Sequence, residues 1–178
     1  MSTHWEGSLA SFSQERQSGS STPHPAQYRP RSSADRVHVA AVCYRVADGE
    51  IEFLLVRTQT GRWTFPKGGV DDDPTFAAAA AREAYEEAGV RGTVEQRAFA
   101  LYKHRKAGAF RRKEVEVAAH LCRVTRLERA PEAHRDPTWF AFEHARKRLR
   151  EKRARRYGEE LERVLESALS RIQRLNRQ

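Results

Sequence analysis

Short apolar runs of β-branched and aromatic residues are the clearest pattern in the middle of the chain. The first, RVHVAAVCYRV at residues 36–46, predicts a buried strand. The turn sequence ADGE follows it, and IEFLLVRT at residues 51–58 predicts a second strand. Because a short Asp-Gly turn joins them, the two strands are expected to form a hairpin. The next segment, QTGRWTFPKGG at residues 59–69, has the glycines and proline of a loop.

A helix is predicted at residues 74–88. Asp73 is a suitable N-cap, and Pro74 suits the first helical position, where no N–H is needed. The alanine run at residues 77–81 has high helix propensity and allows close packing against a sheet. Gly89 stands where a helix commonly ends.

Strand patterns return after this helix. The segments at residues 93–105 and 113–127 each predict one strand, with a basic loop between them, and residues 137–142 predict a last short strand. Two helical segments then follow, with a break expected near Gly158. The final helix has an apolar stripe at a spacing of three and four residues.

These patterns divide the chain into three parts. Residues 1–35 are rich in Ser, Pro, Gln and Arg and predict a disordered tail, and residues 36–145 hold the mixed strands and helix. Residues 146–178 predict a basic C-terminal helical extension. The mixture of strands with a helical crossover indicates an α+β fold, an α/β/α sandwich.

The net charge and the cysteine content indicate which kinds of partner and which cellular compartment to expect. The net charge of +9 favours an anionic partner, which could be a phosphorylated small molecule, a nucleic acid or an acidic membrane. Cys43 and Cys122 lie in apolar strands and are expected to be buried, reduced thiols. No apolar run reaches the length of a membrane span, and no secretory signal is recognisable. We therefore expect a cytoplasmic protein, with an organelle transit peptide as the alternative.

The predicted helix carries three crowded carboxylates, Glu83, Glu86 and Glu87. At 100° per residue they share one side of the helix, where like charges repel unless a cation compensates them. Hard divalent ions such as Mg²⁺ or Mn²⁺ prefer these oxygen ligands. Arg82 is placed to hold Glu86 at i+4, and the Gly68-Gly69 backbone can approach the metal. The simpler interpretation is a solvated acidic face.

The spacing of these residues is specific. Gly68, the pair Arg82-Glu83, the pair Glu86-Glu87 and the pair Gly89-Val90 match G-x5-E-x7-R-E-U-x-E-E-x-G-U, in which U is a bulky apolar residue. In this respect the chain resembles the Nudix hydrolases. Two positions depart from the signature. Pro74 replaces the first Glu, for which Asp71 to Asp73 are possible substitutes, and the U after R-E is only Ala84.

The resemblance implies a Nudix fold, with a mixed sheet between helices, and hydrolysis of a phosphoanhydride bond. It makes Glu83, Glu86 and Glu87 the metal ligands, with the Gly68 carbonyl. Glu83 or Glu86 would orient or deprotonate the attacking water, and Arg82 would orient the glutamates. Some family members use a further carboxylate on a later strand, for which Glu114 and Glu116 are candidates, although exposed positions on an alternating strand are the preferred explanation of both.

The flanks RWTFPKGG and WFAFEHARKRL resemble the branch of diphosphoinositol polyphosphate and diadenosine polyphosphate phosphohydrolases. The resemblance therefore implies a polyphosphorylated small-molecule substrate. The candidate phosphate-binding residues are Arg57, Lys67, Lys103, Arg105 and Arg112. Two alternatives stay open. The basic segment ARKRLREKRARR would suit an RNA 5'-end pyrophosphohydrolase, and Pro74 would suit a catalytically silent Nudix-fold binding module.

Overall fold

The computed structural model describes residues 37–106 and 113–177. The predicted hairpin is confirmed, with strand β1 (His38–Ala47) antiparallel to β2 (Glu50–Arg57). Its turn has positive φ at both Asp48 and Gly49 (51° and 82°), which is the backbone of the two-residue turn that favours Asp-Gly. The predicted tail at residues 1–35 lies outside the described residues.

The segment expected to be a loop contains two short strands. β3 (Trp63–Thr64) pairs with β2, and β4 (Lys67–Gly69) pairs with β1, both antiparallel. The prediction of a loop was therefore incomplete, because a strand of two or three residues is too short to show a periodicity in sequence. The pairing with β1 is important because it fixes the backbone of the two adjacent glycines.

Helix α1 (Phe76–Ala88) starts two residues later than predicted. Its N-cap is Thr75, whose Oγ1 accepts a hydrogen bond from the Ala78 N–H at 3.1 Å. Asp73 is not the cap because its carboxylate binds the Arg82 guanidinium instead. The predicted end is confirmed, since Gly89 has φ 65° and its N–H bonds to the carbonyls of the last turn.

This assignment gives a direct test. Replacing Thr75 with Ala should lower the free energy of unfolding by about 1 kcal/mol, because one N-terminal N–H of α1 loses its acceptor. Chemical denaturation of Thr75→Ala beside the wild type measures the difference. Thr60→Ala, in an exposed turn outside any helix, is the control and should change stability by less. An unchanged stability in Thr75→Ala would mean that another group caps the helix.

The segment at residues 93–105 forms two strands and not one. β5 (Val90–Val94) and β6 (Ala100–Lys106) both pair antiparallel with β7 (Lys113–Leu127), which is long enough to hold them end to end. β7 also pairs in parallel with β1, so the sheet is mixed. The buried thiols of Cys43 and Cys122 lie opposite each other in this parallel pair, and both are free, as expected.

The C-terminal part contains β8 (Thr138–Ala141), α2 (Phe142–Arg150) and α3 (Arg155–Leu175), with a short 3₁₀ helix, η2 (Ala133–Arg135), before them. The break between the helices is at residues 151–154, so the expectation of a break at Gly158 was wrong. Gly158 is buried inside α3, and a Cβ there would lie 3.3 Å from the Arg150 Cα. The glycine therefore allows α3 to pack closely against the end of α2.

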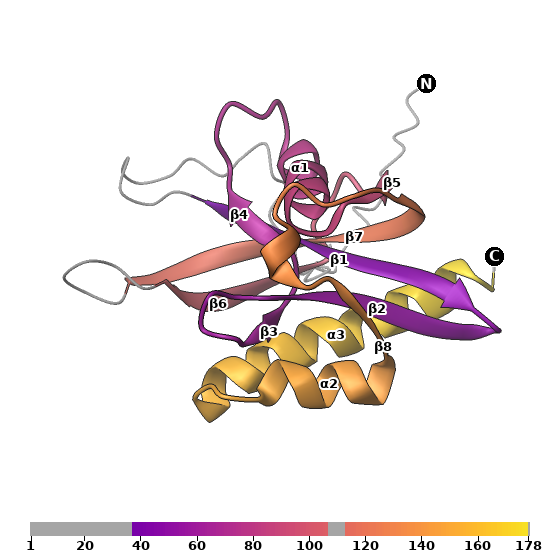
Figure 1. Ribbon diagram of the computed structural model, residues 1–178. Coiled ribbons are helices and arrows are strands. Elements are labelled where there is room, and N and C mark those ends of the chain that lie inside the picture. Colours follow the sequence, from indigo (N-terminus) through magenta and orange to yellow (C-terminus); the bar gives the residue numbers. More distant parts are fainter. Residues whose placement is uncertain (1–36, 107–112, 178) are drawn as a thin grey trace, which may run out of the picture.

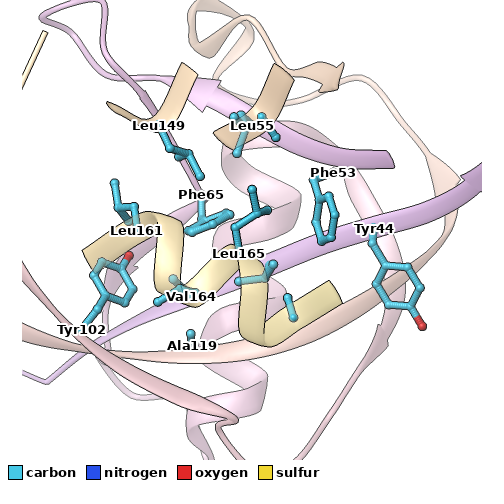
Figure 2. Packing of buried hydrophobic residues seen from close by; sticks show 14 of the residues in the cluster. Tyr44, Phe53, Leu55, Phe65, Tyr102, Ala119, Leu149, Leu161, Val164 and Leu165 are labelled. Atoms are coloured by element: carbon cyan, nitrogen blue, oxygen red, sulfur yellow. The ribbon is translucent and has the colours of Figure 1, made fainter. Parts of the chain in front are cut away.

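The molecule has the expected three layers (Figure 1), with α1 on one face of the sheet and α2 and α3 on the other. The alanines of α1 pack on one face of the sheet, in a cluster with Val39, Leu54 and Val90. On the other face, Leu161, Val164 and Leu165 of α3 face sheet residues such as Phe53 and Tyr102 (Figure 2). The apolar stripe of the last helix is thus buried as its spacing predicted.

Two further points concern the chain as a whole. The boundary predicted between residues 145 and 146 falls inside α2, and the side chains of α3 share the core of the sheet. No helix in the described part of the chain is long and apolar enough to cross a membrane.

Candidate active site

The candidate site lies where strand β4 meets helix α1. The pairing of Val39 with Gly68 and of His38 with Gly69 holds the two glycines against β1. The helix places Arg82, Glu83 and Glu86 beside this strand, and its last turn adds Glu87. The sequence positions that matched one signature are therefore brought together in space.

Arg82 is the centre of this arrangement. Its Nη1 donates to Glu83 Oε1 at 2.8 Å and to Glu86 Oε2 at 3.0 Å. Its Nη2 donates to the Gly69 carbonyl at 2.9 Å and to Asp73 Oδ2 at 3.0 Å. The hydrogen bonds that Arg82 donates to Asp73 are the main cause that raises the pKa of Arg82. One guanidinium thus joins the loop, the helix and two of the three expected metal ligands.

Asp73 takes a supporting position that the sequence left open. Pro74 replaces the first Glu of the signature, and the carboxylate one residue earlier binds Arg82 from the loop side. The Asp71 carboxylate lies 3.7 Å from the same guanidinium. The departure at Pro74 therefore leaves Arg82 with acidic partners.

Glu83 is buried directly against Gly68. A Cβ added to Gly68 would overlap the Glu83 carboxylate, so only glycine allows that carboxylate to lie on the strand backbone. Burial raises the pKa of Glu83, and the Arg82 charge opposes the shift. This contact places the expected carbonyl ligand and one carboxylate next to each other.

Glu87 is the most buried of the three glutamates, with 2% of its surface exposed. Its Oε2 accepts the Lys67 N–H at 3.2 Å, and its Oε1 lies 2.5 Å from Arg135 Nη2. Burial raises the pKa of Glu87 to about 7, although the charges of Lys67 and Arg135 favour the ionised form. Arg135 follows from no sequence motif, because it comes from η2, 48 residues along the chain.

The donor chemistry of this group suits a hard divalent cation. Three carboxylates and the backbone of a glycine strand supply only oxygen, which Mg²⁺ and Mn²⁺ prefer. Glu83 and Glu86 share one nitrogen of Arg82, so both carboxylates are close to the same point. Within the described residues, no three acidic, His or Cys side chains converge as a closed metal cluster, since Arg82 and Arg135 bind the carboxylates.

The expected phosphate-binding residues are more scattered. Lys67 belongs to the site, and burial lowers the pKa of its ammonium while the Glu87 carboxylate opposes the shift. Arg57 lies over the Trp63 ring and 3.0 Å from Asp136, and Lys103 lies 3.3 Å from Glu114. Arg105 lines a pocket beside the start of α3. Arg112 lies outside the described residues.

The two candidate carboxylates on β7, Glu114 and Glu116, contact other residues or solvent. Glu114 binds Arg156 at 2.8 Å and accepts a hydrogen bond from the Tyr157 hydroxyl at 3.2 Å. Glu116 is exposed on β7. The alternation of exposed and buried residues in this part of β7 agrees with the simpler interpretation of both residues.

Comparison with known proteins adds three findings. The NUDIX domain family model matches residues 36–161. The rat diphosphoinositol polyphosphate phosphohydrolase 2 is 46% identical over 55 residues, which cover 30% of each chain. The mitochondrial Nudix hydrolase 17 of Arabidopsis thaliana is 40% identical over 77 residues, covering 39% of this chain and 42% of that one. The chain thus spans less than half the length of these curated relatives.

Solved structures show the same fold. The Ap4A hydrolase of C. elegans, in a binary complex, has a TM-score of 0.57 and 24% identity, covering 77% of this chain and 97% of its own. The NUDIX domain of Shewanella oneidensis NrtR, complexed with ADP ribose, has a TM-score of 0.60 and 19% identity, covering 83% and 95%. With the match over residues 36–161 and the glutamates held by one arginine beside Gly68, the chain belongs to the Nudix family.

Proposed function

We propose that this protein is a metal-dependent pyrophosphohydrolase that cleaves a phosphoanhydride bond in a polyphosphorylated small molecule. The observation that carries the proposal is the hydrogen bonding of Arg82 to Glu83, Glu86 and the Gly69 carbonyl. These hydrogen bonds hold two carboxylates and the backbone of β4 together beside α1. Hydrolysis of a phosphoanhydride with a divalent ion requires such a group of oxygen ligands.

The residues that would hold Mg²⁺ or Mn²⁺ are Glu83, Glu86, Glu87 and, through its carbonyl, Gly68. Such an ion neutralises phosphate charge and lowers the pKa of a bound water. Glu86 is assigned to orient and deprotonate that water, because it is the most accessible of the three glutamates, with 39% of its side chain exposed. Arg82 keeps Glu83 and Glu86 in place, and Asp73 keeps Arg82 in place.

The proposed substrate class rests on charge and on relatives. The chain has a net charge of +9, and the half-buried Lys67 directly precedes Gly68, one of the candidate metal ligands. Phosphate-rich molecules are the anions that such a site attracts. Two of the similar proteins are named for diphosphoinositol polyphosphates and for Ap4A. Dinucleoside polyphosphates and diphosphoinositol polyphosphates are therefore the proposed substrates.

Hydrolysis of a substrate panel tests this proposal. The panel contains diadenosine polyphosphates, a diphosphoinositol polyphosphate, ADP-ribose, 8-oxo-dGTP and triphosphorylated RNA, each with Mg²⁺ and separately with Mn²⁺. Turnover of the polyphosphates is expected, and EDTA in excess of the metal should abolish it, because without the cation the carboxylates repel the phosphates and the attacking water keeps its high pKa. Turnover of RNA alone would favour a 5'-end pyrophosphohydrolase. Binding of the panel without any turnover would favour a silent binding module.

A further inference from the structure

A second site adjoins the candidate active site on the side of the sheet that carries α3. It is a pocket of about 570 Å³ between the β2–β3 turn, strand β6 and the turn that joins α2 to α3. Four of its lining residues carry a permanent positive charge, and none of its lining residues is acidic. These four are Arg62, Arg105, Lys152 and Arg153.

The four cations have no carboxylate partner among the residues that the structure describes. Two of the four, Lys152 and Arg153, belong to the basic run at residues 145–156. The five other arginines of this run all form ion pairs with glutamates: Arg146, Arg148, Arg150, Arg155 and Arg156. Arg153 therefore differs from the other arginines of the run, which are neutralised within the protein.

Among the four cations, Arg153 gives the clearest indication that the pocket binds an anion. Its Nη2 donates to the Trp63 carbonyl, while its Nε is buried without a hydrogen-bond partner within residues 37–106 and 113–177. Burial, and then the charge of Arg62, lowers the pKa of Arg153 to about 10. A charge that is partly desolvated beside a like charge destabilises a fold unless an anion neutralises it.

Other polar atoms in this region also lack partners. Thr64 Oγ1, which lines the pocket, and the Tyr102 hydroxyl, on the neighbouring strand β6, are both buried without a hydrogen bond among the described residues. Buried hydroxyl groups are normally satisfied. Of these groups, Thr64 and Arg153 belong to residues that line the pocket, so donors without a partner lie in its wall.

The turn between the helices contains an unusual backbone conformation. Lys152 has φ 55°, a left-handed conformation that a lysine rarely adopts. Helix α3 starts directly after Ala154, which lines the pocket. Its N-cap makes no side-chain hydrogen bond and no acidic residue lies in its first turn, although the Glu114 carboxylate accepts hydrogen bonds from the Arg156 and Tyr157 side chains.

The pocket is close to the glutamate helix. The charge of Arg153 contributes to lowering the pKa of Lys67, which adjoins Gly68. The charges of Arg153 and Glu87 both act on the pKa of the Tyr102 hydroxyl. A ligand long enough to hold several phosphates could therefore contact both regions at once.

We propose that this pocket binds the non-scissile phosphate groups of the substrate, and that of the two substrate classes proposed above it favours the densely phosphorylated molecule without a nucleobase over a dinucleoside polyphosphate. Four fixed positive charges match roughly two phosphate groups of 1.5 to 2 charges each. Tyr157 is the one aromatic ring apart from His104 among the lining residues, so the pocket offers little stacking surface for a base. The assignment to the substrate rests on the proposed hydrolase function, whereas the binding of an anion does not.

Binding of inorganic tripolyphosphate, measured by calorimetry without metal, tests the pocket directly. Arg153→Met keeps the apolar stem of the side chain and removes the charge. We expect its affinity for tripolyphosphate to fall at least tenfold, as should that of Arg62→Gln, a second variant in the β2–β3 turn of the pocket. Arg148→Gln, which removes an ion-paired charge from the same basic run, should bind as the wild type does.

A thermal unfolding readout separates this role from a structural one. If Arg153 is kept for an anion, the ligand-free Arg153→Met protein should be as stable as the wild type or more stable, and tripolyphosphate should raise its melting temperature less. A lower melting temperature with unchanged tripolyphosphate binding would overturn the proposal. So would equal affinity in the wild type, Arg153→Met and Arg62→Gln.

Two further comparisons complete the test. ATP should bind no more tightly than tripolyphosphate, and a large gain from the adenosine part would overturn the exclusion of a nucleobase. In hydrolysis, Arg153→Met should raise KM for the densely phosphorylated substrate with little change in kcat. Tripolyphosphate binding without any turnover would leave the pocket standing and refute the hydrolase. Turnover with KM and binding both unaffected by Arg153→Met would leave the hydrolase standing and refute the pocket.

Discussion

Replacing Glu86 with Gln is expected to lower kcat for polyphosphate hydrolysis roughly 10²- to 10⁴-fold, the range over which a missing general base acts. The amide keeps an oxygen that can bind metal, but it cannot take a proton from water. Because Glu86 is partly exposed and contacts Arg82 through one oxygen, the variant should fold normally. Initial rates at saturating Mg²⁺ measure the effect.

The same experiment distinguishes a base from a ligand. If Glu86 acts mainly as the base, the metal concentration that gives half-maximal rate should change little in Glu86→Gln, whereas it should rise in Glu83→Gln. Glu143→Gln, at an exposed position on α2, controls for the loss of one negative charge and should keep full activity. A Glu86→Gln enzyme that retains most of its kcat would remove Glu86 from the chemical step.

Replacing Gly68 with Ala is expected to cost roughly 10²-fold in kcat/KM, with a small change in stability. The new methyl group would occupy the place of the Glu83 carboxylate, and a flexible side chain moves more easily than the strand. The fold should therefore persist while one expected metal ligand is displaced by about an ångström, a shift that catalysis does not tolerate. Activity assays with chemical denaturation of the same samples show both effects.

Gly69→Ala is the matched control for this change. A Cβ on Gly69 would meet only the Asp71 side chain, at 3.8 Å, which is an ordinary contact. Both glycines lie on β4 and pair with β1, so backbone effects should be similar. If Gly68→Ala and Gly69→Ala lose activity equally, the loss comes from the strand and not from the place of Glu83.

Local signals in the sequence were sufficient where neighbouring residues determine the structure. The Asp-Gly turn specified the first hairpin, and Gly89 specified the end of α1, since both need positive φ at those positions. The start of the helix was predicted wrongly because Asp73 and Thr75 are both good caps. The choice depended on Arg82, nine residues from Asp73, which binds that carboxylate and leaves Thr75 to cap.

In the candidate active site, too, some residues could be predicted from the sequence and others could not. The spacing of Glu83, Glu86 and Glu87 on one turn of helix, with Gly68 before them, is readable from the sequence because helical geometry places such residues together. The partner of Glu87 is not readable in this way. Arg135 reaches it from a 3₁₀ helix, and no local rule connects residues so far apart.

By itself, the sequence determined the family signature and the mixed fold class, because both follow from spacing and periodicity within short segments. The residues expected to bind metal came from the resemblance of that signature to the Nudix hydrolases. Only the tertiary structure decided which basic residues are neutralised and which surround a pocket. Arg150 and Arg153 are three residues apart and have the same chemistry, yet one binds Glu162 and the other reaches the carbonyl of Trp63. That difference depends on how α2, α3 and the sheet pack, which brings together segments from distant parts of the chain.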